Sequence, residues 1–122
     1  MINHKTLLKS FIYSFEGVFH AIRYNQNMRI HIIAAILVII ASLILKVTPF
    51  EMGILGIMIL LVIMAEMINT AIEEMVDLIV TEHKRQAKIA KDVASGMVLV
   101  AAMGSVIVGI LIFTPYILKI FR

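Results

Sequence analysis

Three long apolar stretches alternate with short polar segments along this chain of 122 residues. They cover residues 30–46, 51–81 and 92–118. A helix rises ~1.5 Å per residue and about 20 apolar residues cross a bilayer core, so these stretches predict three transmembrane helices. The first stretch is short, and helix before Ile30 or local thinning of the bilayer would make up the difference. The pattern therefore predicts an all-α integral membrane protein with one domain over residues 1–122.

The segment before the first span, residues 1–29, has a different pattern. Its apolar residues recur at spacings of three and four, and basic residues lie between them. This periodicity is typical of an amphipathic helix at the membrane surface, although a soluble helix that binds a partner protein would also show it. The apolar positions are Leu7, Leu8, Phe11, Ile12, Phe15, Val18, Phe19 and Ile22.

The composition supports the membrane class. Hydrophobic residues make up 61% of the sequence and charged residues only 16%. A soluble domain of this size has too much surface to bury so many apolar side chains, whereas lipid removes that requirement. The absence of cysteine excludes disulfides, thiolate metal sites and a cysteine nucleophile. The net charge of +3 is too small to indicate nucleic acid as a partner, and basic residues beside the spans favour the membrane surface.

The distribution of Lys and Arg predicts the orientation in the membrane. Of the 11 such residues, eight lie in the N-terminal segment or in the connection at residues 81–92. The other three, Lys46, Lys119 and Arg122, fall on the opposite side. Because cytoplasmic loops carry an excess of basic residues, we expect the N-terminus and the 81–92 connection in the cytoplasm.

The second apolar stretch ends in polar residues that share one face of its helix, which we call the polar stripe. At about 100° per residue, their side chains fall within roughly a third of the helix circumference. A carboxylate at membrane depth is costly, so the polar stripe is a candidate functional site. For Glu66 or Glu73 taken alone, an ion pair between helices is the alternative. The polar stripe consists of Glu66, Asn69, Thr70, Glu73 and Asp77.

The chemistry of the polar stripe suits phosphoryl transfer. Its carboxylates and amide offer the hard oxygen ligands of Mg²⁺, which commonly binds one or two carboxylates together with substrate phosphates. Basic residues near the end of the same helix could hold such a phosphate. We therefore predict transfer from a soluble nucleotide to an acceptor in the bilayer, with Glu66 as the base nearest the apolar phase. The basic residues are Lys84, Arg85, Lys88 and Lys91.

Two other functions would use the same features. A small oligomer that conducts protons or cations could use the polar stripe, but the basic 81–92 connection would then have no role. A non-catalytic membrane adaptor is the other alternative. An enzyme built from one such chain would have too few walls to enclose a nucleotide, so we expect an oligomer with sites at subunit boundaries. Small residues in the third span, such as Ser105 and Gly109, would allow helices to pack closely.

A specific motif resembles a known family. Residues 66–77 read E-x-x-N-T-A-I-E-x-x-x-D, and Ala90-Lys91-Asp92 follows. Together these resemble the prokaryotic diacylglycerol kinase family of three-span proteins over nearly the whole chain. Residues 76–79 (VDLI) and 29–31 (RIH) look like the branch found in Gram-positive bacteria, whose members are similar to undecaprenol kinases. The resemblance implies a homotrimeric helical bundle with an N-terminal surface helix in the bacterial plasma membrane, with ATP as phosphate donor and Mg²⁺ as cofactor.

The resemblance also implies a reaction and a role for individual residues. The γ-phosphate of ATP would pass to the hydroxyl of a lipid alcohol, giving undecaprenyl phosphate from undecaprenol or, as the alternative, phosphatidic acid from diacylglycerol. Glu66 would be the catalytic base and contact the lipid, Asn69 would belong to the catalytic stripe, and Glu73 would bind the metal. Ser95 would face the lipid. The residues implied at the nucleotide are Tyr13, Glu82, His83, Lys84, Lys91 and Asp92.

One position departs from the family pattern. The family expects a second metal-binding carboxylate at the end of the surface helix, and in this chain Asn25 occupies that position. An amide oxygen can coordinate Mg²⁺ but brings no charge. We therefore expect Asn25 to be a metal ligand that lowers metal affinity or turnover relative to a carboxylate.

Overall fold

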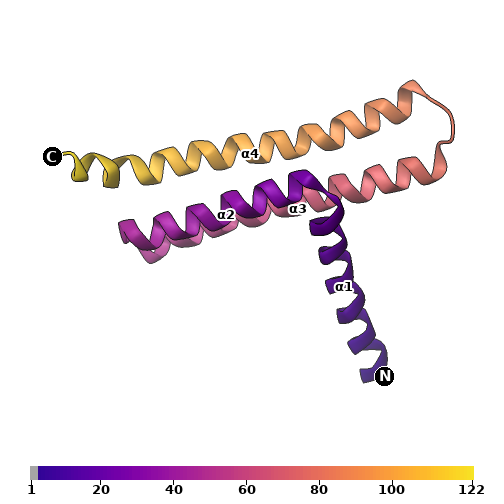
Figure 1. The fold of residues 1–122 in the computed structure, drawn as a ribbon, viewed down its shortest axis with the longest axis horizontal. Helices are drawn as coiled ribbons and strands as arrows, with labels where there is room; N and C mark the ends of the chain where they lie inside the picture. The colour runs from indigo at the N-terminus through magenta and orange to yellow at the C-terminus, as the bar shows by residue number, and fades with distance from the viewer. Residues whose placement is uncertain (1–2) are drawn as a thin grey trace.

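The computed structural model describes residues 3–122 as four helices joined by short connections. Helices α2, α3 and α4 run alongside one another, and α1 leaves this bundle crosswise (Figure 1). Helix α4 packs mainly against α3. The helices are α1 (His4–Tyr24), α2 (Gln26–Leu45), α3 (Pro49–Ile79) and α4 (Arg85–Ile120).

The corner between α1 and α2 is a single residue, Asn25. Its backbone is extended (φ −107°, ψ 112°), and this conformation turns the chain out of α1. Its N–H donates to the carbonyl of Ala21, while its side chain caps the start of α2. Arg29 closes the corner because its guanidinium donates to the carbonyls of Ile22 and Arg23, at 3.2 and 2.5 Å, near the end of α1. Helix α2 thus begins four residues before the predicted start at residue 30.

The turn between α2 and α3 follows from its sequence. Lys46 takes the left-handed conformation (φ 54°) that commonly ends a helix. Thr48 then caps α3, because its hydroxyl oxygen accepts from the N–H of Glu51 at 3.2 Å and its hydroxyl lies 2.9 Å from the Glu51 carboxylate. Pro49 occupies the first turn of α3, where its missing N–H costs nothing. This tight turn places α2 and α3 side by side.

Helix α4 is longer than the predicted third span. It starts at Arg85, seven residues before residue 92, and ends at Ile120. Its first two turns therefore take in much of the charged 81–92 connection. The true connection between α3 and α4 is short, and the basic residues of α4 lie on a helix rather than on a loop.

Three of the helices, α2, α3 and α4, are long and apolar enough to cross a membrane. Buried apolar side chains such as Leu55, Val62 and Val98 lie on α3 and α4, whereas most large apolar residues face outward. Outward apolar surface of this extent is stable in lipid and would be costly in water. The predicted all-α class with three apolar spans is confirmed within residues 3–122. The surface position of α1 and the trimer stay predictions.

Candidate active site

The Glu66 carboxylate is buried where α3 meets the corner between α1 and α2. Only 1% of this residue is exposed. Asn25 donates from Nδ2 to Glu66 Oε1 at 2.6 Å, and Asn69 Nδ2 lies 3.4 Å from the same oxygen. His31 Nε2 lies 3.7 Å from Glu66 Oε2. A buried carboxylate is costly unless it is hydrogen-bonded or paired, and Oε1 meets that requirement through its two amide donors.

Asn69 and Glu73 provide oxygen atoms that suit a hard cation. Asn69 is 4% exposed, and its Oδ1 is buried without a hydrogen-bond partner among the described residues. Its Nδ2 lies 3.5 Å from Glu73 Oε1, one turn further along α3. Within residues 3–122, no three His, Asp or Glu side chains form a metal site by themselves. Mg²⁺ needs only one or two carboxylates when substrate phosphates complete its shell, so the Glu73 carboxylate and the unpartnered oxygen of Asn69, one turn before it on α3, are ligand types that suit this ion.

Both the oxygen and the nitrogen of the Asn25 amide form hydrogen bonds within the protein. Oδ1 accepts from the backbone N–H groups of Asn27 and Met28, at 2.9 and 3.3 Å, as the N-cap of α2. Nδ2 donates to Glu66 and to Thr70, the latter at 2.7 Å. The metal role of Asn25 stays a prediction; here its oxygen caps α2, and its nitrogen, an atom that cannot bind a cation, faces Glu66.

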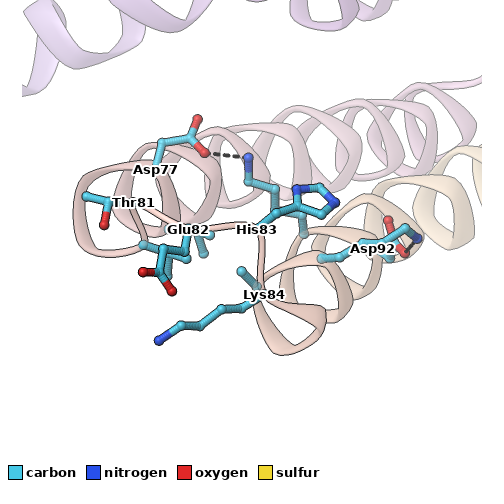
Figure 2. Close-up of a pocket in the computed structure, with 11 residues that line it drawn as sticks. Asp77, Thr81, Glu82, His83, Lys84 and Asp92 are labelled. Atoms are coloured by element: carbon cyan, nitrogen blue, oxygen red, sulfur yellow. Dashed lines mark hydrogen bonds and ion pairs between the residues drawn. The ribbon is translucent and has the colours of Figure 1, made fainter.

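A pocket of about 460 Å³ lies at the connection between α3 and α4. Five of the six residues predicted at the nucleotide line it, and Figure 2 labels four of them, Glu82, His83, Lys84 and Asp92, around the connection. Tyr13, the sixth, is exposed on α1 and does not line this pocket. The five are Glu82, His83, Lys84, Lys91 and Asp92.

Two ion pairs are formed by residues that line the pocket. The ammonium group of Lys91 on α4 donates to the carboxylate of Asp77, the last member of the polar stripe on α3 (Figure 2). Lys88 pairs with Asp92 one turn along α4, at 2.6 Å. A phosphate entering this pocket would therefore meet lysines whose present partners are exposed carboxylates. Such pairs are weak in water, so an anion with several charges can compete for the lysines.

The polar stripe connects the two sites. Asp77 lies eleven positions after Glu66, which corresponds to ~16 Å along α3. The buried carboxylate thus lies at the apolar end of one helix face, and the charged pocket lies at its other end. Ser95, predicted to face the lipid, is exposed on α4 and makes no hydrogen bond to the polar stripe among the described residues. A single chain therefore leaves Tyr13 and Ser95 outside the two sites.

Comparison with known proteins decides the family. The model of the family described as prokaryotic diacylglycerol kinase matches residues 12–113. The chain belongs to the prokaryotic diacylglycerol kinase family. This confirms the resemblance drawn from residues 66–77 and 90–92.

Two relatives in this family carry different names. A diacylglycerol kinase of Synechocystis sp. is 40% identical over 115 residues, which is 93% of this chain but 66% of that protein. An undecaprenol kinase of Bacillus subtilis is 39% identical over 107 residues, which is 88% of this chain and 87% of that protein. This chain thus spans slightly less than two thirds of the Synechocystis relative. Both names support the prediction of a lipid kinase, and they differ in the lipid.

His31 lies beside Glu66, although the sequence predicted no role for it. Within residues 3–122, it is the one basic side chain within 4 Å of the Glu66 carboxylate. In the sequence, His31 belongs to the RIH motif (residues 29–31), which indicated only a resemblance to the Gram-positive branch. A signal was nevertheless present, since an ionisable side chain inside an apolar span indicates a functional position. His31 is the second residue of the apolar stretch that starts at Ile30.

Proposed function

We propose that this chain transfers the γ-phosphate of ATP to the hydroxyl group of a membrane lipid alcohol. The observation that carries the proposal is the polar stripe itself, which joins a buried carboxylate among apolar helices to a charged pocket at the α3–α4 connection. A lipid hydroxyl and a soluble nucleotide belong to different phases. An enzyme that joins them needs one site in each phase and a polar path between the two.

In this proposal each residue of the site has a separate role in catalysis or binding. Glu66 accepts the proton of the lipid hydroxyl as it attacks, and Asn69 holds the Glu66 carboxylate. Glu73 and the free oxygen of Asn69 would hold Mg²⁺, which would offset the negative charge of the phosphates. Ser95 contacts the lipid. The nucleotide is held by Tyr13, Glu82, His83, Lys84, Lys91 and Asp92.

The acceptor we propose is undecaprenol, with diacylglycerol as the alternative. The relative named undecaprenol kinase matches this chain over 87% of its own length, compared with 66% for the relative named diacylglycerol kinase. With purified protein in bilayers, labelled ATP and equal mole fractions of the two lipids, we expect kcat/KM for undecaprenol to be higher by about tenfold or more. Phosphatidic acid as the faster product would replace the proposed acceptor, and no labelled lipid at all would contradict the kinase.

The metal role of Glu73 has its own test. Replacing Glu73 by Gln removes a charged ligand, so the Mg²⁺ concentration for half-maximal activity should rise by at least about tenfold. Direct Mn²⁺ binding, followed by electron paramagnetic resonance, should weaken in parallel. The matched control is Glu74→Gln, because the Glu74 side chain is 72% exposed and pairs only loosely with His20 at 3.9 Å. Equal Mg²⁺ dependence in the two variants would remove Glu73 from the metal site.

We also propose a homotrimer in the bacterial plasma membrane, with the N-terminus and the active site in the cytoplasm. The excess of Lys and Arg on that side supports the orientation. The exposed positions of Tyr13 and Ser95 in one chain support active sites shared between subunits, since another copy could bring both residues to the polar stripe. Helix α1, with its basic and apolar residues, would lie on the membrane surface. The net charge of +3 gives no support for a nucleic acid partner.

A further inference from the structure

The hydrogen bonds of Asn25 fix the orientation of its amide. The N-cap of a helix must accept from backbone N–H groups, so the atom facing Asn27 and Met28 is the oxygen. The nitrogen therefore faces α3, where it is 2.6 Å from Glu66 Oε1 and 2.7 Å from Thr70 Oγ1. Exchanging the two atoms would lose the cap and set an oxygen against the Glu66 carboxylate.

Thr70 supports this orientation independently. Its hydroxyl donates to the carbonyl of Glu66 at 2.9 Å, so its single proton is already used. Thr70 Oγ1 can then only accept from its neighbour across the helices. The neighbour is Asn25, which must present an N–H group. Every hydrogen bond in this small network thus has one donor and one acceptor.

We infer that Asn25 is a positioning residue for Glu66 rather than a metal ligand, an inference that rests on the proposed role of Glu66 as the base. The amide holds Oε1 of the carboxylate from the corner between α1 and α2. Asn69 lies at the same oxygen, while His31 lies at Oε2. The carboxylate is therefore held mainly through one oxygen, and the other faces a weaker partner at 3.7 Å. A hydroxyl group could approach this second oxygen without breaking the Asn25 bond.

This arrangement makes the corner part of the catalytic geometry. A buried glutamate has several rotatable bonds, and a displacement of about 1 Å at a reacting group can lower a rate about 100-fold. Asn25 removes that freedom while it also starts α2. One side chain thereby ties the position of the α1–α2 corner to the position of the Glu66 carboxylate.

The test replaces Asn25 by Ser in the full-length protein. Ser caps helices as well as Asn does, so α2 keeps its cap, but its short side chain has no amide to extend to Glu66. We expect kcat to fall about 10- to 100-fold, because a hydrogen bond to a charged group is lost. The KM values for ATP and lipid, and the affinity for Mn²⁺ measured by electron paramagnetic resonance, should stay within about twofold of the wild type.

The control is Asn27→Ser, the same substitution at an exposed residue on the first turn of α2. It should leave kcat, both KM values and Mn²⁺ affinity unchanged. A weaker Mn²⁺ affinity in Asn25→Ser would identify Asn25 as a metal ligand and overturn the inference. An unchanged kcat in Asn25→Ser would overturn it as well.

A second measurement does not depend on turnover. The ¹⁵N side-chain amide signal of Asn25, assigned by its loss in Asn25→Ser, should shift in Glu66→Gln because its acceptor becomes neutral. A signal that does not move would show that the contact is absent and overturn the inference. Failure of the proposed function is a different result, in which the wild type phosphorylates no lipid alcohol while the Asn25 signal still reports its contact with Glu66.

Discussion

Replacing Glu66 by Gln is expected to lower the rate of lipid phosphorylation by about 10²- to 10⁴-fold, the usual contribution of a general base. The amide cannot accept the proton of the attacking hydroxyl. The fold should survive, because the amide oxygen of Gln can still accept from Asn25 and Asn69, which now contact Glu66 Oε1. The loss should therefore appear in kcat, with the KM for ATP close to that of the wild type.

The measurement is initial-rate formation of phosphorylated lipid by purified protein in bilayers, with ATP and Mg²⁺ saturating. Glu74→Gln serves as the control, because it makes the same chemical change on the same helix at an exposed position. Thermal unfolding in detergent should be similar for both variants. If Glu66→Gln kept more than about a tenth of wild-type turnover, the proton would have to leave by another route and Glu66 would lose its role.

The fold was predictable because the bilayer imposes a simple rule. A helix must be apolar for about 20 residues to cross it, and this requirement is visible in composition alone. The helix ends were less visible, because they depend on local hydrogen bonds. Asn25 begins α2 at residue 26 by capping it, and Arg85 begins α4 within residues that are charged but still have helical spacing. The spacing of apolar residues reveals neither the Asn25 cap nor the charged first turn of α4.

The polar stripe was predictable for the same kind of reason, since residues on one helix face are related by a fixed period. The residues that contact the polar stripe from other helices were not predictable. Asn25 and His31 reach Glu66 from α1–α2, across 41 and 35 positions of sequence, and no periodicity relates residues on different helices. The predicted metal role of Asn25 came from its place in a motif. The structure adds which atom of the amide faces the site, and that atom is a donor.

The pocket at the α3–α4 connection, unlike the contacts of Glu66, is formed by residues that are close in sequence. Its predicted residues are close in sequence, so a short connection between two antiparallel helices brings them together. Tyr13 and Ser95 were predicted from the same resemblance but lie on the outer surfaces of α1 and α4. Local sequence can specify a pocket within one chain. It cannot specify a site whose remaining walls would belong to other subunits.

Replacing Lys91 by Met is expected to lower kcat/KM for ATP by about 10- to 100-fold, with little change in the KM for lipid. The substitution removes a cation from the pocket and leaves the Asp77 carboxylate without its partner, so an incoming phosphate loses an attraction and gains a repulsion. Adding Asp77→Asn should therefore recover part of the loss, which a double-mutant cycle would measure. Lys119→Met, at the far end of α4, is the control and should leave ATP kinetics unchanged. If Lys91→Met weakened lipid and ATP equally, the charged pocket would serve the fold rather than the nucleotide.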